Sequence, residues 1–98
     1  MQQGYNAERP LGYYQISADA GGTLTTLGAP PPIGTTVAVI KVEGQAARYR
    51  DDNVAPTASV GMPLAVGDVL IYTSGRFGQL QFISQTAGAI LNILYYAH

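Results

Sequence analysis

The acidic residues near the middle of the chain are its first candidates for chemistry. Asp51 and Asp52 are adjacent, with Arg50 before them and Asn53 after them. Converging carboxylate and amide oxygens bind hard cations, and two carboxyl groups flanking a substrate can catalyse glycoside hydrolysis. The alternating acidic spacing of a calcium loop is missing, however, and adjacent aspartates at a strand end tend to diverge. We therefore predict a turn, with Arg48 and Arg50 pairing with the two carboxylates.

Other catalytic or metal-binding residues are scarce. The only histidine is His98, the last residue, and a side chain there is usually too mobile for a triad or a metal site. There is no cysteine, which excludes a disulfide framework and a thiolate zinc site. Ser59 and Ser84 lie in no nucleophile-elbow pattern, and "GAPPPIG" at 28–34 has no lysine for a phosphate loop. We expect no enzyme, metal or cofactor.

Charge is unusually sparse in these 98 residues. Charged residues make up 11%, against about 25% in typical soluble domains, and the net charge is −1. This composition argues against nucleic-acid binding and polybasic membrane attachment. There is no signal-peptide pattern and no apolar run near the roughly 20 residues that span a bilayer. A small domain with so few charges is poorly protected against association, so we expect partners to cover much of its surface.

Short β-branched and aromatic runs dominate the chain, and 12 Gly and 6 Pro separate them. This pattern predicts an all-β fold: one antiparallel β-sandwich over residues 1–98, jelly-roll-like, with an immunoglobulin-like sandwich as the alternative. Residues 1–12 are expected to form an irregular arm. The expected strands are 13–17, 23–27, 35–44, 45–50, 57–62, 69–74, 79–84 and 90–97, with 35–44 and 45–50 forming a hairpin.

Two connections have specific turn chemistry. Three prolines (Pro30, Pro31, Pro32) cannot donate to a β-ladder, so 28–34 is predicted to be an extended loop or an edge segment. Gly67 and Asp68 are predicted to form a turn in which Gly67 takes a positive φ.

The last strand, "ILNILYYA", is apolar on both faces. A sandwich buries only one face of each sheet, so we predict that at least one such face contacts another subunit. The tyrosines could instead form a platform for a carbohydrate or a single-stranded nucleic acid, although packing is the commoner role. The residues predicted to make contacts are Tyr5, Tyr13, Tyr14, Pro30, Pro31, Pro32, Leu91, Ile93, Tyr95 and Tyr96.

Two longer stretches carry a family resemblance. "ARYRDDNVAPTASVGMPLAVGDVLIY" and "LQFISQTAGAILNILYYA" resemble a group of small virion proteins of tailed bacteriophages. The shared pattern is an Arg-x-Arg-Asp-Asp-Gly turn, Pro-Thr, Gly-Met-x-Leu, a Gly-Asp turn and a Leu-Asn-x-x-Tyr-Tyr strand, and the similarity covers residues 12–97. Asn53 replaces the turn glycine, and Asn tolerates a left-handed φ better than most residues.

The resemblance implies a structural protein of the phage particle. Such proteins often act as capsid decoration or cement proteins on the outer capsid surface, where they bridge major capsid protein subunits. For this chain it implies binding to the major capsid protein and to copies of itself, as a dimer or trimer. The alternatives are a head–tail connector, a tail or fibre component, or a carbohydrate-binding module for host attachment.

Overall fold

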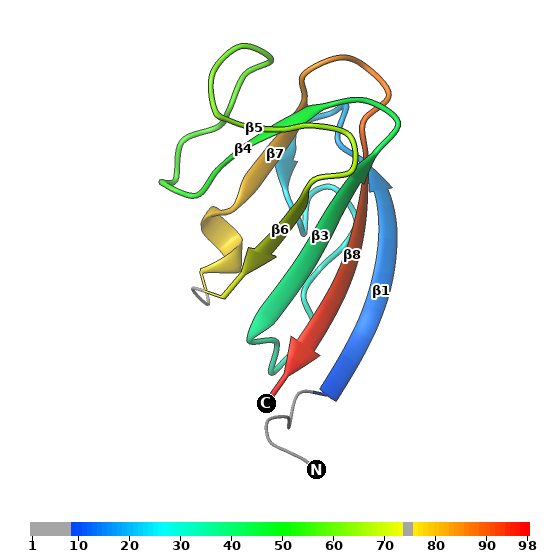
Figure 1. The fold of residues 1–98 in the computed structure, drawn as a ribbon. Coiled ribbons are helices and arrows are strands. Elements are labelled where there is room, and N and C mark those ends of the chain that lie inside the picture. Colours follow the sequence, from blue (N-terminus) through cyan, green and yellow to red (C-terminus); the bar gives the residue numbers. More distant parts are fainter. Residues whose placement is uncertain (1–8, 74–75) are drawn as a thin grey trace.

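A computed structural model describes residues 9–73 and 76–98. Its strands form two four-stranded antiparallel sheets that face each other (Figure 1). The first sheet has the order β1 (Arg9–Ser17), β8 (Ile90–Ala97), β3 (Val37–Glu43) and β6 (Val69–Tyr72). The second sheet has the order β2 (Gly22–Thr23), β7 (Gln81–Ser84), β4 (Ala47–Arg50) and β5 (Met62–Leu64). A short 3₁₀ turn, η1 (Phe77–Gln79), precedes β7.

The pairing of the strands defines a jelly roll. β1 pairs with β8, β2 with β7, β3 with β6 and β4 with β5, all antiparallel. In each pair, a strand from the first half of the chain lies beside one from the second half, in reverse order. The four pairs together form one long antiparallel ribbon that is rolled into two sheets. The jelly-roll prediction is confirmed. The immunoglobulin-like alternative is wrong, because that sandwich has a different strand order in its two sheets.

Alternating apolar residues explain why these segments form half-buried strands. In β3, Ala38, Ile40 and Val42 are fully buried, whereas Lys41 is exposed. The alternation therefore places one side of the strand in the core. The same holds at β7, where Phe82 is buried and Gln81 is partly exposed.

Three local predictions are corrected by the structure. The hairpin of 35–44 with 45–50 is wrong, because β3 and β4 belong to different sheets. Residues 9–12 belong to β1 and not to an irregular arm, while residues 1–8, including Tyr5, lie outside the described part of the chain. The strands expected at 23–27 and 57–62 are displaced to Gly22–Thr23 and Met62–Leu64.

A cluster of aromatic rings packs around the fully buried Tyr95. Tyr95 makes edge-to-face contacts with Tyr14 and Phe77, at ring-centroid distances of 5.8 and 6.5 Å, and Phe77 contacts Tyr72 at 5.5 Å. Such geometry adds stability beyond the apolar area buried. The residues of the core cluster that are fully buried are Ala18, Leu24, Ala29, Ala38, Ile40, Val42, Ala47, Leu80, Phe82, Ala89, Leu91, Ile93 and Tyr95.

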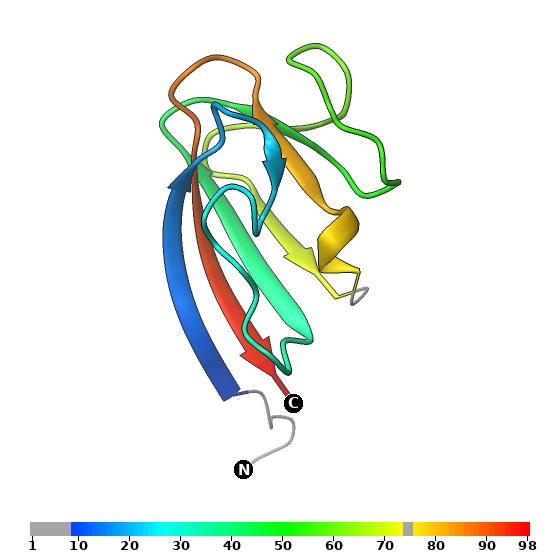
Figure 2. The same ribbon diagram turned by 180° about the vertical axis from the view of Figure 1, so that it is seen from behind.

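The connection from β2 to β3 completes the core where β2 is short. Figure 2 shows this segment running across the interior side of the first sheet. Leu24 and Ala29 are 0% exposed, and the buried Tyr95 hydroxyl donates a hydrogen bond to the carbonyl of Ala29. The proline-rich loop that follows belongs to neither sheet, and it ends in a turn in which the Thr35 N–H donates to the Pro32 carbonyl at 3.1 Å. Among the described residues, no helix is long and apolar enough to cross a membrane.

Candidate interaction surfaces

The outer face of the first sheet carries a row of apolar side chains. The strand registers place Tyr13 beside Leu94, Leu94 beside Val39, and Val39 beside Ile71. Tyr13 is 56% exposed and Ile71 64% exposed. Cross-strand neighbours on one face lie within contact distance, so the row crosses all four strands as one apolar band. Exposed bands of this kind mark contacts with other molecules.

A polar network lies directly beside this band. The Tyr13 hydroxyl donates a hydrogen bond of 2.7 Å to Asn92 Oδ1, and Gln15 Nε2 donates one of 3.0 Å to the same atom. Asn92 Nδ2 and Gln15 Nε2 both donate to Glu43 Oε1, at 2.8 and 3.1 Å. The network therefore holds the exposed ring of Tyr13 in one orientation. The hydrophobic periodicity of the sequence does not predict this network, because its four residues come from three strands.

Tyr96 extends this face toward the end of the sheet where the last strand ends (Figure 1). The backbone N–H of Thr36 donates a hydrogen bond of 2.8 Å to the Tyr96 carbonyl, which brings the end of the proline-rich loop beside β8. In that loop, Ile33 is fully exposed. We use the name aromatic surface for Tyr13, Leu94 and Tyr96.

The residues predicted to make contacts divide between this surface and the interior. Tyr13 and Tyr96 lie on the outer face, and Pro30, Pro31 and Pro32 lie in the neighbouring loop. Tyr14 is half-buried against Tyr95. For Leu91, Ile93 and Tyr95 the contact prediction is wrong, because all three are 0% exposed beneath the second sheet.

The Arg-Asp-Asp turn forms a single ion pair. Arg50 Nε and Nη2 donate to the two carboxylate oxygens of Asp52, at 3.0 and 2.5 Å. The hydrogen bond with Asp52 raises the pKa of Arg50, and the same bond lowers the pKa of Asp52. Asn53 has a φ of 65°, the left-handed conformation predicted for it.

Arg48 does not pair with either aspartate, so that part of the prediction is wrong. Its Nε and Nη1 instead donate to the carbonyls of Ala58 and Gly61, at 3.1 and 2.8 Å. Arg48 therefore stabilises the β4–β5 loop. At the next turn Gly67 has a φ of 92°, and Ala65 N–H donates to Asp68 Oδ2 at 2.8 Å, which confirms the predicted turn.

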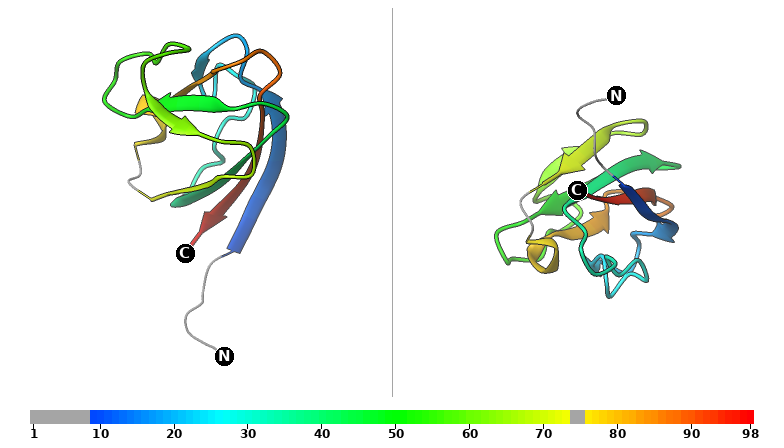
Figure 3. Two further views of the ribbon diagram at one scale, coloured as in Figure 1. Left: turned by 45° about the horizontal axis from the view of Figure 1, so that its top comes forward. Right: turned by 90° about the horizontal axis from the view of Figure 1, so that it is seen from below.

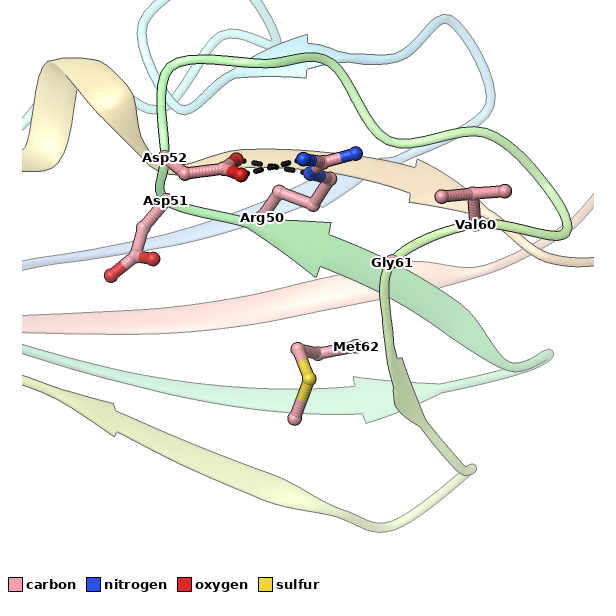
Figure 4. A pocket seen from close by; sticks show the side chains of 6 residues that line it. All are labelled: Arg50, Asp51, Asp52, Val60, Gly61 and Met62. Carbon is pink, nitrogen blue, oxygen red and sulfur yellow. Dashed lines mark hydrogen bonds and ion pairs between the residues drawn. The ribbon is translucent and has the colours of Figure 1, made fainter.

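An open pocket of about 280 Å³ lies between the end of β4 and the start of β5. Its lining residues are Arg50, Asp51, Asp52, Val60, Gly61 and Met62. Figure 4 shows Asp52 facing Arg50, whereas Asp51 points away from that pair. Val60 and Met62 are 52% and 58% exposed, so the pocket combines apolar groups with a carboxylate.

Within residues 9–73 and 76–98, no three His, Cys, Asp or Glu side chains are grouped so that they could hold a metal ion. His98 is exposed. Comparisons with protein-family models, curated proteins and solved structures find no match to this chain. The structural class is therefore defined by the fold and its surfaces alone: a jelly roll with an apolar band across one outer face.

Proposed function

We propose that this chain is a non-enzymatic structural protein of a tailed-bacteriophage particle, and specifically a capsid decoration or cement protein. In this role it binds the outer capsid surface, bridges adjacent major capsid protein subunits and associates with copies of itself. The phage assignment rests on the sequence resemblance. The observation that carries the docking role is the apolar band on the outer face of the first sheet, in a chain with few charges.

The aromatic surface is well suited to bind another protein. Tyrosine offers a large apolar ring with a polar tip and has few side-chain torsions to immobilise. Here the hydrogen bond between Tyr13 and Asn92 already fixes the exposed ring. A side chain that is ordered before binding loses less conformational entropy on binding, so more of the interaction energy contributes to affinity.

Because a decoration protein binds a repeating lattice, modest contacts at each site are sufficient for stable attachment. A ligand that binds only the mature lattice stabilises it by mass action. Two or more contacts made by one oligomer increase the total affinity through effective concentration. The protein therefore needs rigid docking surfaces and no reaction centre.

Purified capsids of the cognate phage provide the test. We expect the protein to cosediment with expanded capsids and to raise their melting temperature, and we expect Leu94→Asp to abolish both effects. Val54→Asp is a matched control, because Val54 is 49% exposed but lies in the β4–β5 loop. Failure to bind either expanded or immature shells would reject capsid decoration, and density at the neck or tail in a virion map would reassign the protein there.

A second function is favoured by one observation. Tyr13 lies beside exposed amide and carboxylate groups of Gln15 and Glu43, and an aromatic ring next to such groups suits a sugar ring and its hydroxyls. Jelly rolls also occur among lectin domains. A glycan array separates the two functions, because Tyr13→Ala should abolish glycan binding only if the protein recognises sugars.

A further inference from the structure

Nearly every charged side chain that the structure describes already has a partner. Arg50 pairs with Asp52, Arg48 binds loop carbonyls, and Glu43 accepts from Gln15 and Asn92. The remaining ones with interactions are Arg9, Asp19, Asp68 and Arg76. Lys41 and Asp51 are different: within the described chain, neither side chain has a hydrogen bond or an ion pair. Residues 9–73 and 76–98 therefore carry one free cationic and one free anionic side chain.

Both free charges lie among exposed apolar side chains. Lys41 is on the outer face of β3, directly opposite Val69, which is 51% exposed. Asp51 lines the pocket with Val60 and Met62, both more than half exposed. We use the name hairpin-end surface for Lys41, Asp51, Val60, Met62, Val66 and Val69.

These residues belong to neighbouring parts of the sandwich. β5 leads through the turn at 65–68 directly into Val69 at the start of β6, and Lys41 is near the end of β3 beside it. Figures 1 and 3 show the β4–β5 loop at the end of the molecule remote from the C-terminus. The hairpin-end surface therefore lies away from Tyr96 and the proline-rich loop, although Lys41 and Val69 occupy the row next to Val39 and Ile71 on the outer face of the first sheet.

We propose that a second copy of this chain docks on the hairpin-end surface about a twofold axis, with Lys41 of each copy binding Asp51 of the other. A twofold interface requires that when one residue contacts another, the reciprocal contact also forms. One free lysine and one free aspartate in each copy meet this requirement without any further group. The contact specifies the self-association included in the proposed function and does not depend on capsid binding.

The pocket fits a lysine side chain chemically. The aliphatic stem of a lysine packs on apolar side chains while its ammonium stays at a polar site, and here Val60, Met62 and Asp51 line the same pocket. Arg50 does not compete for Asp51, because it donates to both oxygens of Asp52. The apolar contacts supply affinity, and the two symmetric ion pairs fix the orientation of the copies.

Charge reversal tests the contact in the full-length protein. Sedimentation velocity over a concentration series should show a monomer–dimer equilibrium for the wild type. Lys41→Glu and Asp51→Lys should each raise its dissociation constant about tenfold, because each change opposes like charges at two symmetric contacts. The double variant Lys41→Glu/Asp51→Lys should restore the wild-type value to within about threefold, since the pairs re-form with reversed polarity.

Two controls distinguish loss of the interface from a general effect of charge or loss of folding. Arg9→Glu reverses an exposed charge on β1, outside the surface, and should leave association unchanged. Thermal melting of each variant shows whether it remains folded. A wild type that stays monomeric or forms a trimer, single variants that associate normally, or a double variant without rescue would each overturn the proposal. Capsid cosedimentation of the Asp51→Lys protein, whose substitution lies in the pocket and not in the apolar band, separately tests the proposed function. The proposed function can therefore fail while the dimer is confirmed.

Discussion

The hydroxyl of Tyr95, on the inner strand β8 of the first sheet, donates a hydrogen bond to the carbonyl of Ala29 in the β2–β3 connection. Both residues are 0% exposed, although 66 positions separate them in the sequence. The bond satisfies a backbone carbonyl that water does not reach, and it anchors the segment that covers the core beside the short β2. Burial also raises the pKa of Tyr95, so the hydroxyl remains a donor across the physiological range.

Removal of this hydroxyl should destabilise the protein. We expect Tyr95→Phe to lower the free energy of unfolding by about 1–2 kcal/mol, because it leaves a buried carbonyl without a donor. Urea denaturation measures the loss. Tyr14→Phe is the matched control: its ring packs on Tyr95, but its hydroxyl has no hydrogen bond within the described residues, so this change should be nearly neutral. Equal losses in the two variants would contradict the role assigned to the bond.

Asp19 joins three parts of the chain that meet at the end of β1. Its Oδ1 accepts hydrogen bonds from the Ser84 hydroxyl at 2.5 Å and from the Gly88 N–H at 2.9 Å. These two bonds, the one from Ser84 first, lower the pKa of the Asp19 carboxyl group below its usual value. Asp19 was not singled out in the sequence, because a lone aspartate after a strand has no distinctive spacing.

The lowered pKa of Asp19 makes the stability of the fold depend on pH. A carboxyl group whose pKa is lower in the folded state stabilises the fold above its unfolded pKa, and this contribution is lost as the pH falls through the folded pKa. We therefore expect the melting temperature to fall in strong acid and to fall less in Asp19→Asn. Asp52 has a lowered pKa as well, so Asp19→Asn/Asp52→Asn should show the weakest dependence. An unchanged pH profile in both variants would exclude this explanation.

Periodicity predicted most strands but not the sheet to which each belongs. Alternation separates Ile40 from Lys41 and Phe82 from Gln81, because burial of one strand face is a local property. The turn at Gly44 suggested a hairpin, yet the chain crosses there from the first sheet to the second. A β-carbon at Gly44 would lie 2.5 Å from the carbonyl oxygen of Gly88. Glycine is required for this close approach as well as for a turn, so the sequence alone does not distinguish the two.

Only part of the interaction surface could be predicted from the sequence, and the reason is related. β8 is apolar on both faces, and its own sequence does not show which face the second sheet covers. Leu91 and Ile93 are covered, while Leu94 is exposed. The apolar band and the network around Asn92 arise from the registers of β1, β3 and β6 against one another. Those registers depend on non-local pairing, which one strand's pattern does not contain.

Gly61 combines a positive φ with closely packed neighbours. Its φ is 140°, and a β-carbon there would lie 3.1 Å from Pro56 Cβ and 3.2 Å from Arg48 Cβ. We expect Gly61→Ala to destabilise the protein by about 1–3 kcal/mol, because it combines backbone strain with crowding. Gly78→Ala is the control, since no atom lies within 4 Å of the position that a β-carbon would take there. Similar melting temperatures for the two variants would argue against a restricted site at Gly61.

Arg48 and Arg50 lie two residues apart but should respond differently to the loss of their charge. Arg48→Met keeps the aliphatic stem and removes the donors to Ala58 and Gly61. We expect a loss of about 1 kcal/mol in the free energy of unfolding, because charged donors to loop carbonyls are removed. Thermolysin should also cleave residues 51–61 faster, because local opening of this loop becomes easier. Arg50→Met breaks only a surface ion pair and should show little of either effect. If cleavage is equally fast in both variants, the carbonyl contacts of Arg48 do not hold the loop.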